Sequence, residues 1–306
     1  MSKIKKIIIK IYYLIRFFNY PQRVLVPDTF RARELFNSLD HIVHWNEYRL
    51  RTKLAKKYLD INTINLDSGY GRSQSSLNTE IDFISSYAKS IDWDKYGNKK
   101  SFLRSVPIRY GVIKELDALI TSDEIIGPIA SYFGLFPVFS NARIFYSPNT
   151  ENFELGSQSP HLDSEDIKQI KCWIPLDDIS SNSGPLNILP ANKSRSVYEK
   201  LLKNKLISRR NVKLSDAIFS KYSNNNEWIQ CTGAVGDLIF TDTCRCYHFG
   251  SRKAKTPRLV LMLHYFMPSS MEVPFLIRKK KVYQDEELTY LLGYQEQLFI
   301  NKYRSN

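Results

Sequence analysis

The sequence contains little cysteine, and acidic residues are fewer than basic ones. Four cysteines among 306 residues exclude a disulfide-stapled scaffold, so we expect a chain that stays in a reducing cytoplasm. The 44 lysines and arginines outnumber the 31 aspartates and glutamates, and the net charge of +13 suggests an acidic partner. A coding bias towards lysine would produce the same excess, because isoleucine and asparagine are abundant as well.

Several familiar functional signatures are also missing. No apolar run is long and uncharged enough to span a membrane, and no small-residue cleavage site follows the N-terminal apolar stretch. The run Gly69-Tyr70-Gly71-Arg72 is not followed by the Lys-Ser or Lys-Thr of a phosphate-binding loop. No recognisable nucleic-acid reader motif occurs, so we expect no nucleic-acid partner.

The overall composition indicates one globular domain, and the sequence divides into four segments. With 43% hydrophobic and 25% charged residues, the chain can bury a sizeable core. We expect a basic amphipathic helix over 1–20, a mostly helical region over 21–137, a β-rich core over 138–270 with a basic insert at 193–232, and a tail with a helix over 271–306.

The first segment combines an apolar stripe with basic residues. The stripe repeats every three or four positions, as one face of a helix does, and consists of Ile4, Ile7, Ile8, Ile11, Leu14, Ile15 and Phe18. Such a helix can lie in an anionic membrane surface, or it can pack on the protein's own core. We expect a cytoplasmic protein. If the helix lies in a membrane surface, residues 1–18 would make peripheral contact with the inner membrane.

The β-rich core contains five short segments of β-forming residues, separated by clusters of Gly, Pro, Asn and Ser. They are 138–146, 168–174, 186–190, 236–241 and 258–266. Short strands punctuated in this way are typical of a sandwich or jelly roll. Together with the helices before it, this core predicts an α+β chain that is mainly β.

Within this core, Ser159-Pro160-His161-Leu162-Asp163 places a histidine and an aspartate two positions apart. On an extended strand both side chains point to the same side. One further imidazole would complete the two-histidine, one-carboxylate set that holds Fe(II) on three positions and leaves three open. His248 and His264 are the two candidates for that imidazole.

A zinc site is the competing interpretation of the same region. Cys244, Cys246 and His248 alternate along the chain, as zinc ligands can. No second cysteine pair exists to close a structural zinc site, so the iron interpretation is favoured.

The order of motifs resembles a known family. After His161-Leu162-Asp163 come Trp-Ile-Pro-Leu-Asp-Asp at 173–178, Gly-Pro-Leu at 184–186, Gly-Asp-Leu-Ile-Phe at 236–240, and an arginine ten positions past His248. Over residues 140–268 this order is similar to the phytanoyl-CoA dioxygenase family of Fe(II)- and 2-oxoglutarate-dependent oxygenases. The segment 190–194 departs from the pattern, because Pro-Ala-Asn-Lys-Ser stands where members usually carry Gly-Ser-His.

The resemblance implies a fold, a ligand set and cosubstrates. The fold is a double-stranded β-helix, which is a cupin-like jelly roll, with iron at its open end. The metal ligands, which are also the catalytic residues, are His161, Asp163 and His248, since only His248 is followed by an arginine in the expected place. Arg258 would hold the far carboxylate of 2-oxoglutarate, because arginine can bind a carboxylate through two hydrogen bonds. Trp173 would line the cavity, and Arg143 would reach 2-oxoglutarate or the substrate.

The implied activity is hydroxylation of an unactivated C–H bond with O2, Fe(II) and 2-oxoglutarate. Asp163 is present where related iron halogenases have a small residue, and this favours hydroxylation over halogenation. The basic insert would steer a small anionic, lipid-linked or sugar-linked substrate to the mouth, unless it is only a solvated helix. The competing hypothesis is a catalytically silent anion- or membrane-surface-binding module on a cupin-like barrel.

Overall fold

The protein was studied as a computed structural model of the 306-residue chain. The structure describes residues 4, 6–12, 30–59, 64–96, 103–148, 156–163, 166–207, 214–270 and 282–293. The residues Leu14, Ile15 and Phe18 of the N-terminal stripe lie outside these ranges, as do residues 208–213 of the basic insert and 294–306 of the tail.

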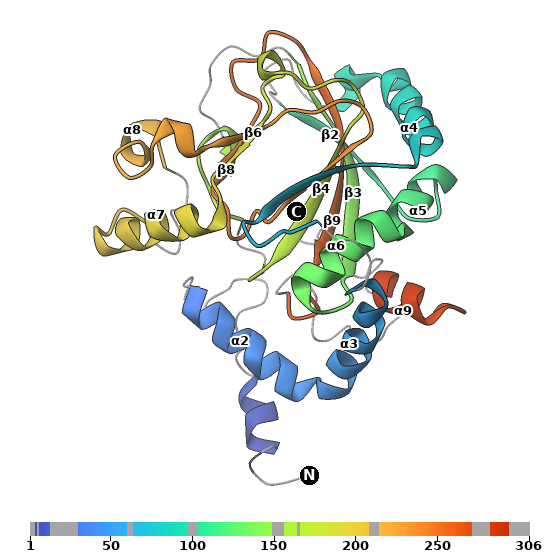
Figure 1. The fold of residues 1–306 in the computed structure, drawn as a ribbon, viewed down its shortest axis with the longest axis vertical. Helices are drawn as coiled ribbons and strands as arrows, with labels where there is room; N and C mark the ends of the chain where they lie inside the picture. Colours follow the sequence, from blue (N-terminus) through green and yellow to red (C-terminus); the bar gives the residue numbers. More distant parts are fainter. Residues whose placement is uncertain are drawn as a thin grey trace.

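A six-stranded antiparallel sheet forms one wall of the barrel (Figure 1). Its strand order is β1-β7-β4-β9-β3-β2, so strands far apart in the sequence are neighbours. The bounds are β1 Tyr70–Gln74, β2 Arg104–Ile108, β3 Val138–Ser147, β4 Gln169–Pro175, β7 Asp237–Thr241 and β9 Arg258–Phe266.

A second antiparallel sheet of three strands forms the opposite wall. Its order is β6-β5-β8, with β5 at Leu186–Ile188, β6 at Ile229–Cys231 and β8 at His248–Phe249. An isolated antiparallel bridge between His161 and His248 extends this sheet by one more short piece of chain. Two facing antiparallel sheets connected in this way are a double-stranded β-helix, so the predicted fold class is confirmed.

Most helices cover the outer face of the six-stranded sheet and the bottom of the barrel, and the others lie on the side of the small sheet (Figure 1). The helices are α2 Phe30–Val43, α3 Trp45–Leu59, α4 Asn78–Ser90, α5 Lys114–Thr121, α6 Asp123–Phe133, α7 Ala191–Lys203, α8 Asp216–Phe219 and α9 Glu286–Leu292. Short 3-10 helices occur at Trp93–Tyr96, Gly156–Gln158, Ser181–Ser183 and Asn225–Glu227. Together these helices make "mainly β" too strong a description, and α+β is the accurate one.

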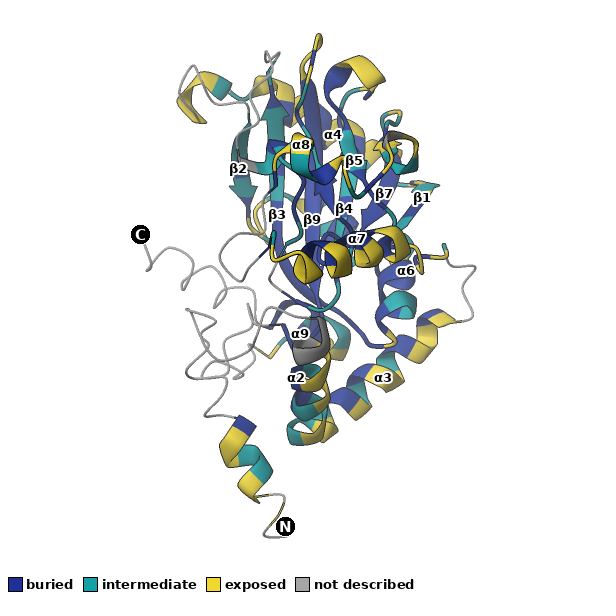
Figure 2. Ribbon diagram, turned by 90° about the vertical axis from the view of Figure 1, so that its left-hand side faces the viewer, coloured by how far each residue is buried: buried dark blue, intermediate teal, exposed yellow. Residues whose placement is uncertain are grey.

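The main hydrophobic core lies between the helices α3 to α6 and the outer face of the six-stranded sheet. Alternate residues of β9 point into it, namely Leu259, Leu261, Leu263 and Tyr265. The residues between them therefore point into the barrel, as the two-residue period of a strand requires. Figure 2 shows the central strands as buried, while α2, α3 and α7 carry exposed outer faces.

All five segments expected as strands form strands, but four shorter strands were not predicted. β1 and β2 lie in the region expected to be mostly helical, and β6 and β8 have only three and two residues. Pairing with a neighbouring strand, which has no local sequence signal, stabilises such short strands. Within the region expected to be mostly helical, Pro128 lies inside α6, and the break between α5 and α6 occurs at Ser122, whose ψ of 141° is extended.

The N-terminal helical residues contact the rest of the protein at one edge of the apolar stripe. Ile4, Ile7 and Ile11 are 70%, 55% and 48% exposed, whereas Ile8 is half-buried and Tyr12, one turn after it, is fully buried. The Tyr12 ring stacks on Phe36 of α2 with 5.4 Å between centroids, and its hydroxyl donates to Asp40. Most of the described part of the stripe is therefore exposed. No helix in the described part of the chain has the length and apolarity needed to cross a bilayer.

The described part of the basic insert is an amphipathic helix, α7, whose inner side joins a second hydrophobic cluster through Val197, Tyr198 and Leu201. Two of its cations are paired with acids: Lys193 Nζ lies 2.8 Å from Glu227 Oε1, and Arg195 Nε lies 3.2 Å from Glu199 Oε1. The segment boundaries given above, the single-domain assignment and the steering role of the insert stay predictions.

Candidate metal centre

The two histidines of the candidate site are brought together by backbone pairing. The amide of His161 donates to the carbonyl of His248 at 3.1 Å, and the amide of His248 donates back at 3.0 Å. Their ring centroids are consequently 4.1 Å apart. Asp163 is fixed next to them because its own amide donates to the carbonyl of Thr243 at 2.9 Å.

Both imidazoles direct Nε2 towards the same carboxylate. Nδ1 of His161 lies 2.8 Å from the Ser159 carbonyl, and Nδ1 of His248 lies 3.1 Å from the Cys246 carbonyl. A carbonyl can only accept, so Nδ1 carries the hydrogen in each neutral ring and Nε2 keeps its lone pair. Each Nε2 is 3.9 Å from an oxygen of Asp163, and one ligand atom from each of the three residues lies within 4.8 Å of the others. Three ligand atoms so placed can bind one metal ion.

The protonation states also suit a metal. Burial lowers the pKa of His248 to about 3, helped by the neighbouring His161, although Asp163 opposes the shift. Burial alone would raise the pKa of Asp163, but the charges of Lys171, His248 and His161 outweigh it and hold that pKa well below its usual range. A neutral imidazole and an ionised carboxylate are the forms that bind metals.

A hydrogen-bond network from β4 orients Asp163. Lys171 Nζ lies 2.6 Å from Asp163 Oδ2, and Gln169 Nε2 donates to the same oxygen at 3.0 Å. Gln169 is fixed in turn, because its Oε1 lies 2.9 Å from Nε2 of His264. Neither Lys171 nor Gln169 was predicted from the sequence. The strand period places both on the same face as Trp173, which they precede by two and four positions, but it does not give their contact with Asp163.

Arg258 is buried at the start of β9, on the face of the strand that points into the barrel. Its Nη1 donates to the Gly184 carbonyl at 2.8 Å, and its Nη2 to the Ser251 hydroxyl at 2.9 Å. These partners are neutral, and the buried Nε has no hydrogen-bond partner among the described residues. Burial lowers the pKa of Arg258 to about 10, which still leaves it charged at neutral pH. The guanidinium also lies beside Gly250, two residues past His248.

Trp173 and Arg143 both lie on the inner face of the large sheet, where Met262 pairs with each of them. Trp173 Nε1 donates to the Thr241 hydroxyl at 2.8 Å, and its ring belongs to an apolar cluster inside the barrel. Nη1 of Arg143 donates to the Ser105 hydroxyl at 3.3 Å. Roles for either residue in cosubstrate binding stay predictions.

The competing ligands do not join the site. His264 lies on β9 and is linked to Asp163 through Gln169, whereas His248 is the histidine that lies next to both His161 and Asp163. Cys244 and Cys246 are buried thiols outside it. Among the described residues, His161, Asp163 and His248 are the one group of three or more metal-binding side chains that lie close enough together to share an ion.

Comparison with known proteins gives distant structural similarities. No family model matches the sequence, and no curated protein matches it. Among solved structures, EctD from S. alaskensis in its apoform is 16% identical, with a TM-score of 0.49, over 75% of this chain and 81% of that one. HygX from Streptomyces hygroscopicus with nickel and 2-oxoglutarate bound is 13% identical, with a TM-score of 0.45, over 74% and 92%. SnoN, an epimerase in complex with Fe3+, alpha ketoglutarate and nogalamycin RO, is 14% identical, with a TM-score of 0.44, over 81% and 95%.

Proposed function

We propose that the chain is an Fe(II)- and 2-oxoglutarate-dependent dioxygenase that hydroxylates an unactivated C–H bond of a small anionic, lipid-linked or sugar-linked molecule. The observation that carries the proposal is the convergence of two histidine Nε2 atoms on one carboxylate at the inner face of the barrel. Two neutral imidazoles and one carboxylate are the donor set of non-haem Fe(II) oxygenases.

The residues at the site fit both groups. His161, Asp163 and His248 would hold the ion, and one negative ligand against a divalent cation leaves a net positive site that attracts 2-oxoglutarate. When bound, iron and 2-oxoglutarate together activate O2 for insertion of an oxygen atom into a C–H bond, with release of succinate and CO2. The protein's own contribution is to hold these groups in place and to exclude water from them.

Arg258 would hold the far carboxylate of 2-oxoglutarate. A buried guanidinium with only neutral partners and an unpartnered Nε needs an anion, because an uncompensated buried charge is costly. The Arg258 guanidinium lies beside Gly250, and Gly250 follows His248 by two residues. The free Nε and the planar fork of the side chain suit a carboxylate bound through two hydrogen bonds.

Arg143 favours an anionic substrate. It lies on the inner face of the sheet, and its one hydrogen bond to a side chain among the described residues is to a neutral hydroxyl. A half-buried cation attracts an anion more strongly than a surface lysine does, since screening is weaker there. Lys171, on the same face, is already paired with Asp163.

The test is binding of metal and cosubstrate, followed by turnover. Calorimetry with Ni(II) as a redox-inert probe should show one site, and 2-oxoglutarate should then bind to the nickel-loaded protein. Both Asp163→Asn and His161→Ala should lose the metal, and Arg258→Met should keep the metal but weaken 2-oxoglutarate by at least about tenfold. Fe(II)-dependent succinate release completes the test, with Asp82→Asn on the exposed side of α4 as the matched control.

A catalytically silent anion-binding module is the alternative outcome. It predicts that the wild-type protein binds 2-oxoglutarate equally well with and without metal, and that His161→Ala changes nothing. Succinate release that requires Fe(II) and disappears in that variant would exclude the silent module.

We also propose that the N-terminal helix contacts an anionic membrane surface. Ile4, Ile7 and Ile11 occupy one exposed face, and the exposed Lys6 and Lys10 flank it. Apolar residues beside lysines suit the interface of an anionic bilayer. Wild-type protein should therefore sediment with vesicles of phosphatidylglycerol, whereas a variant with Asp at positions 4, 7 and 11 should stay in solution. Equal sedimentation of the wild-type protein and the variant would contradict the proposal.

A further inference from the structure

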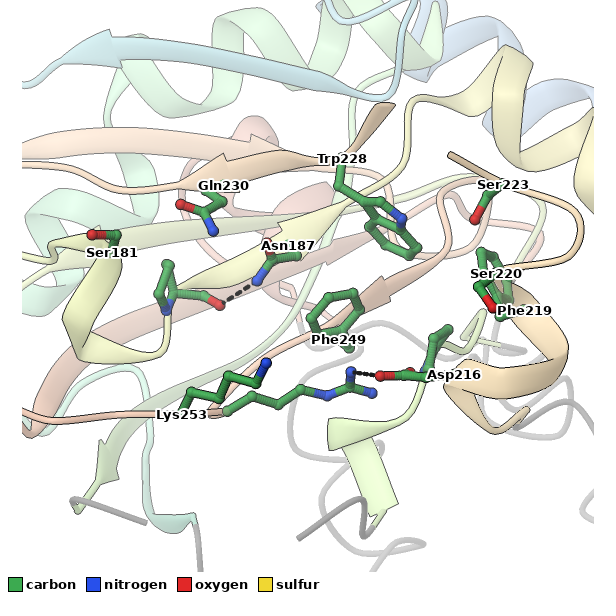
Figure 3. A pocket seen from close by; sticks show the side chains of 13 residues that line it. Ser181, Asn187, Asp216, Phe219, Ser220, Ser223, Trp228, Gln230, Phe249 and Lys253 are labelled. Atoms are coloured by element: carbon green, nitrogen blue, oxygen red, sulfur yellow. Dashed lines mark hydrogen bonds and ion pairs between the residues drawn. The ribbon is translucent and has the colours of Figure 1, made fainter. Parts of the chain in front are cut away.

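A cavity lies on the outer face of the small sheet (Figure 3). In this sheet Leu186 and Ile188 belong to the apolar cluster inside the barrel, so Asn187 between them points outward. Asn187 pairs with Gln230 on one side and with Phe249 on the other, and these three residues therefore share the outer face. The cavity has a volume of about 440 Å³, within the range of small-molecule sites.

Aromatic side chains form one wall of this cavity. The Trp228 ring lies 4.8 Å from the Phe249 ring in an edge-to-face arrangement, and 5.5 Å from the Phe219 ring of α8. Trp228 is half-buried, yet its Nε1 has no hydrogen-bond partner among the described residues. The wall therefore presents both an apolar surface and an indole N–H that can donate to a ligand.

Amide groups form the floor of the cavity. Asn187 Nδ2 donates to the Pro185 carbonyl at 3.0 Å, which leaves Oδ1 free to accept. The Gln230 side chain has no partner among the described residues and points into the same space (Figure 3). Two planar amides side by side offer donors and acceptors that can pair with the hydroxyl groups of a ring.

The loop between β8 and β9 supplies charge to the rim. Arg252 already has partners within the protein: its Nη1 pairs with Asp216 at 2.6 Å, and its guanidinium lies 4.1 Å from the centre of the Phe249 ring. Lys253 makes no ion pair with any described residue, and its amine points towards the cavity in Figure 3. Lys253 has φ of 50° and Ser251 has φ of 58°. Two non-glycine residues in the left-handed region indicate that this loop is held in a strained conformation, as loops at binding sites often are.

We infer that this cavity is a saccharide-binding site, separate from the metal centre, for a pyranose that carries a carboxylate or a phosphate. A pyranose has an apolar C–H face for the Trp228 and Phe249 wall, and hydroxyl groups that can both donate to Asn187 and accept from Gln230 and the Trp228 indole. The acidic substituent pairs with Lys253. The inference does not depend on the oxygenase proposal, because none of these residues belongs to the metal centre.

The test is ligand-observed NMR with the full chain and four probes: glucose, glucuronate, glucose 1-phosphate and inorganic phosphate, each at about 10 mM, where weak millimolar binding is detectable. We expect binding of all three sugars, with the two acidic sugars several-fold tighter than glucose, and no comparable binding of phosphate. Absence of binding by all three sugars would overturn the inference. Equal binding of glucose 1-phosphate and inorganic phosphate would also overturn it, because the site would then recognise only an anion.

Variants locate the binding. Gln230→Ala and Trp228→Phe each remove one hydrogen-bonding group and should weaken the sugars about fivefold, while Trp45→Phe on the exposed surface of α3 is the matched aromatic control. The Lys253→Ala variant should abolish the preference for acidic sugars and leave glucose binding unchanged. His161→Ala should have no effect. Loss of sugar binding in His161→Ala, with wild-type behaviour of Gln230→Ala and Trp228→Phe, would place the sugar at the metal centre and refute a separate site.

Discussion

Asp163 is contacted by a lysine and a glutamine as well as by the two candidate metal-binding histidines. The two polar partners act in opposite directions on a divalent ion. Gln169 is neutral and orients the carboxylate, as groups outside a metal site commonly do. Lys171 carries a positive charge next to the ion and therefore repels it.

We accordingly expect Lys171→Met to bind Ni(II) more tightly than wild type, by about tenfold in the absence of 2-oxoglutarate, since removing a like charge outweighs the lost hydrogen bond while Gln169 remains. Gln169→Leu should weaken Ni(II) by about tenfold. Calorimetry measures both. Weaker nickel binding by Lys171→Met would show that orientation, and not charge, is the dominant contribution of the lysine.

Asp242 gives the folded protein a defined pH dependence. Burial raises the pKa of this carboxyl from 3.8 to about 6, against the opposing influence of Tyr132 and Arg245. The folded protein thus holds this proton more tightly than the unfolded chain, and the contribution of Asp242 to stability is greatest below about pH 4 and is lost as the pH rises through 6.

Asp242→Asn removes this ionisation but keeps an oxygen that can accept from the amides of Cys244 and Arg245, which lie 3.1 Å from Oδ1. Between pH 4 and pH 7.5, we expect the free energy of unfolding to fall less in Asp242→Asn than in wild type, by on the order of 2 kcal/mol. Urea unfolding across this range measures the difference. Parallel pH profiles for the two proteins would contradict the assigned pKa.

At the scale of elements, the turn before β1 is packed against the turn before β8. Gly69 has φ of 76°, and a Cβ placed there would lie 2.3 Å from Sγ of Cys246. Gly111 has a similar φ of 84°, but a Cβ placed on it would have no other atom within 4 Å. Comparing an alanine substitution at each glycine therefore separates the cost of backbone strain from the cost of a steric clash.

Gly111→Ala should cost only the strain of a left-handed alanine, about 1 kcal/mol, whereas Gly69→Ala should cost at least about 2 kcal/mol more. Cys246→Ala in the Gly69→Ala background should recover the collision part but not the strain part. Thermal or urea unfolding of the four proteins gives the comparison. Equal losses for the two glycine variants would mean that the turns can move apart without cost.

The sequence was informative about elements with a strong internal period and uninformative about those without one. The 258–266 segment is a long run of β-formers, and it is β9 as expected. β8 is two residues long and is defined by its pairing with β5. The metal-binding candidates could be identified because a histidine and an aspartate two apart form a local pattern. The partnership of Lys171 with Asp163 has no such pattern, since it depends on how β4 lies against residues 159–163.

At the scale of the whole molecule, Arg51 joins three regions that are distant in the sequence. Its fully buried side chain donates to the carbonyls of Phe136 and Pro137, just before β3, and to the carbonyl of Tyr290 in α9. Glu47 balances its charge at 2.9 Å. Helix α3, the large sheet and α9 are therefore held together by one guanidinium.

Replacing this residue should destabilise the protein as a whole. Arg51→Met leaves three buried carbonyls and Glu47 without their donor, and we expect a loss of about 3–5 kcal/mol of unfolding free energy. Arg49→Met, on the exposed side of the same helix, should stay within about 0.5 kcal/mol of wild type. Urea denaturation followed by circular dichroism decides the matter, and a loss below about 1 kcal/mol for Arg51→Met would contradict a joining role.

The two-residue strand β8 has a consequence for how this protein can change over evolution. His248 faces inward to the metal centre and Phe249 faces outward to the cavity on the outer face of the small sheet, so neighbouring residues contribute to opposite sides of the sheet. A one-residue insertion or deletion immediately before them would turn His248 outward and Phe249 inward, and both the metal centre and the outer cavity would be lost. Insertions and deletions among descendants of this chain should accordingly be confined to segments outside 243–250. The metal centre and the outer cavity should be inherited or lost together.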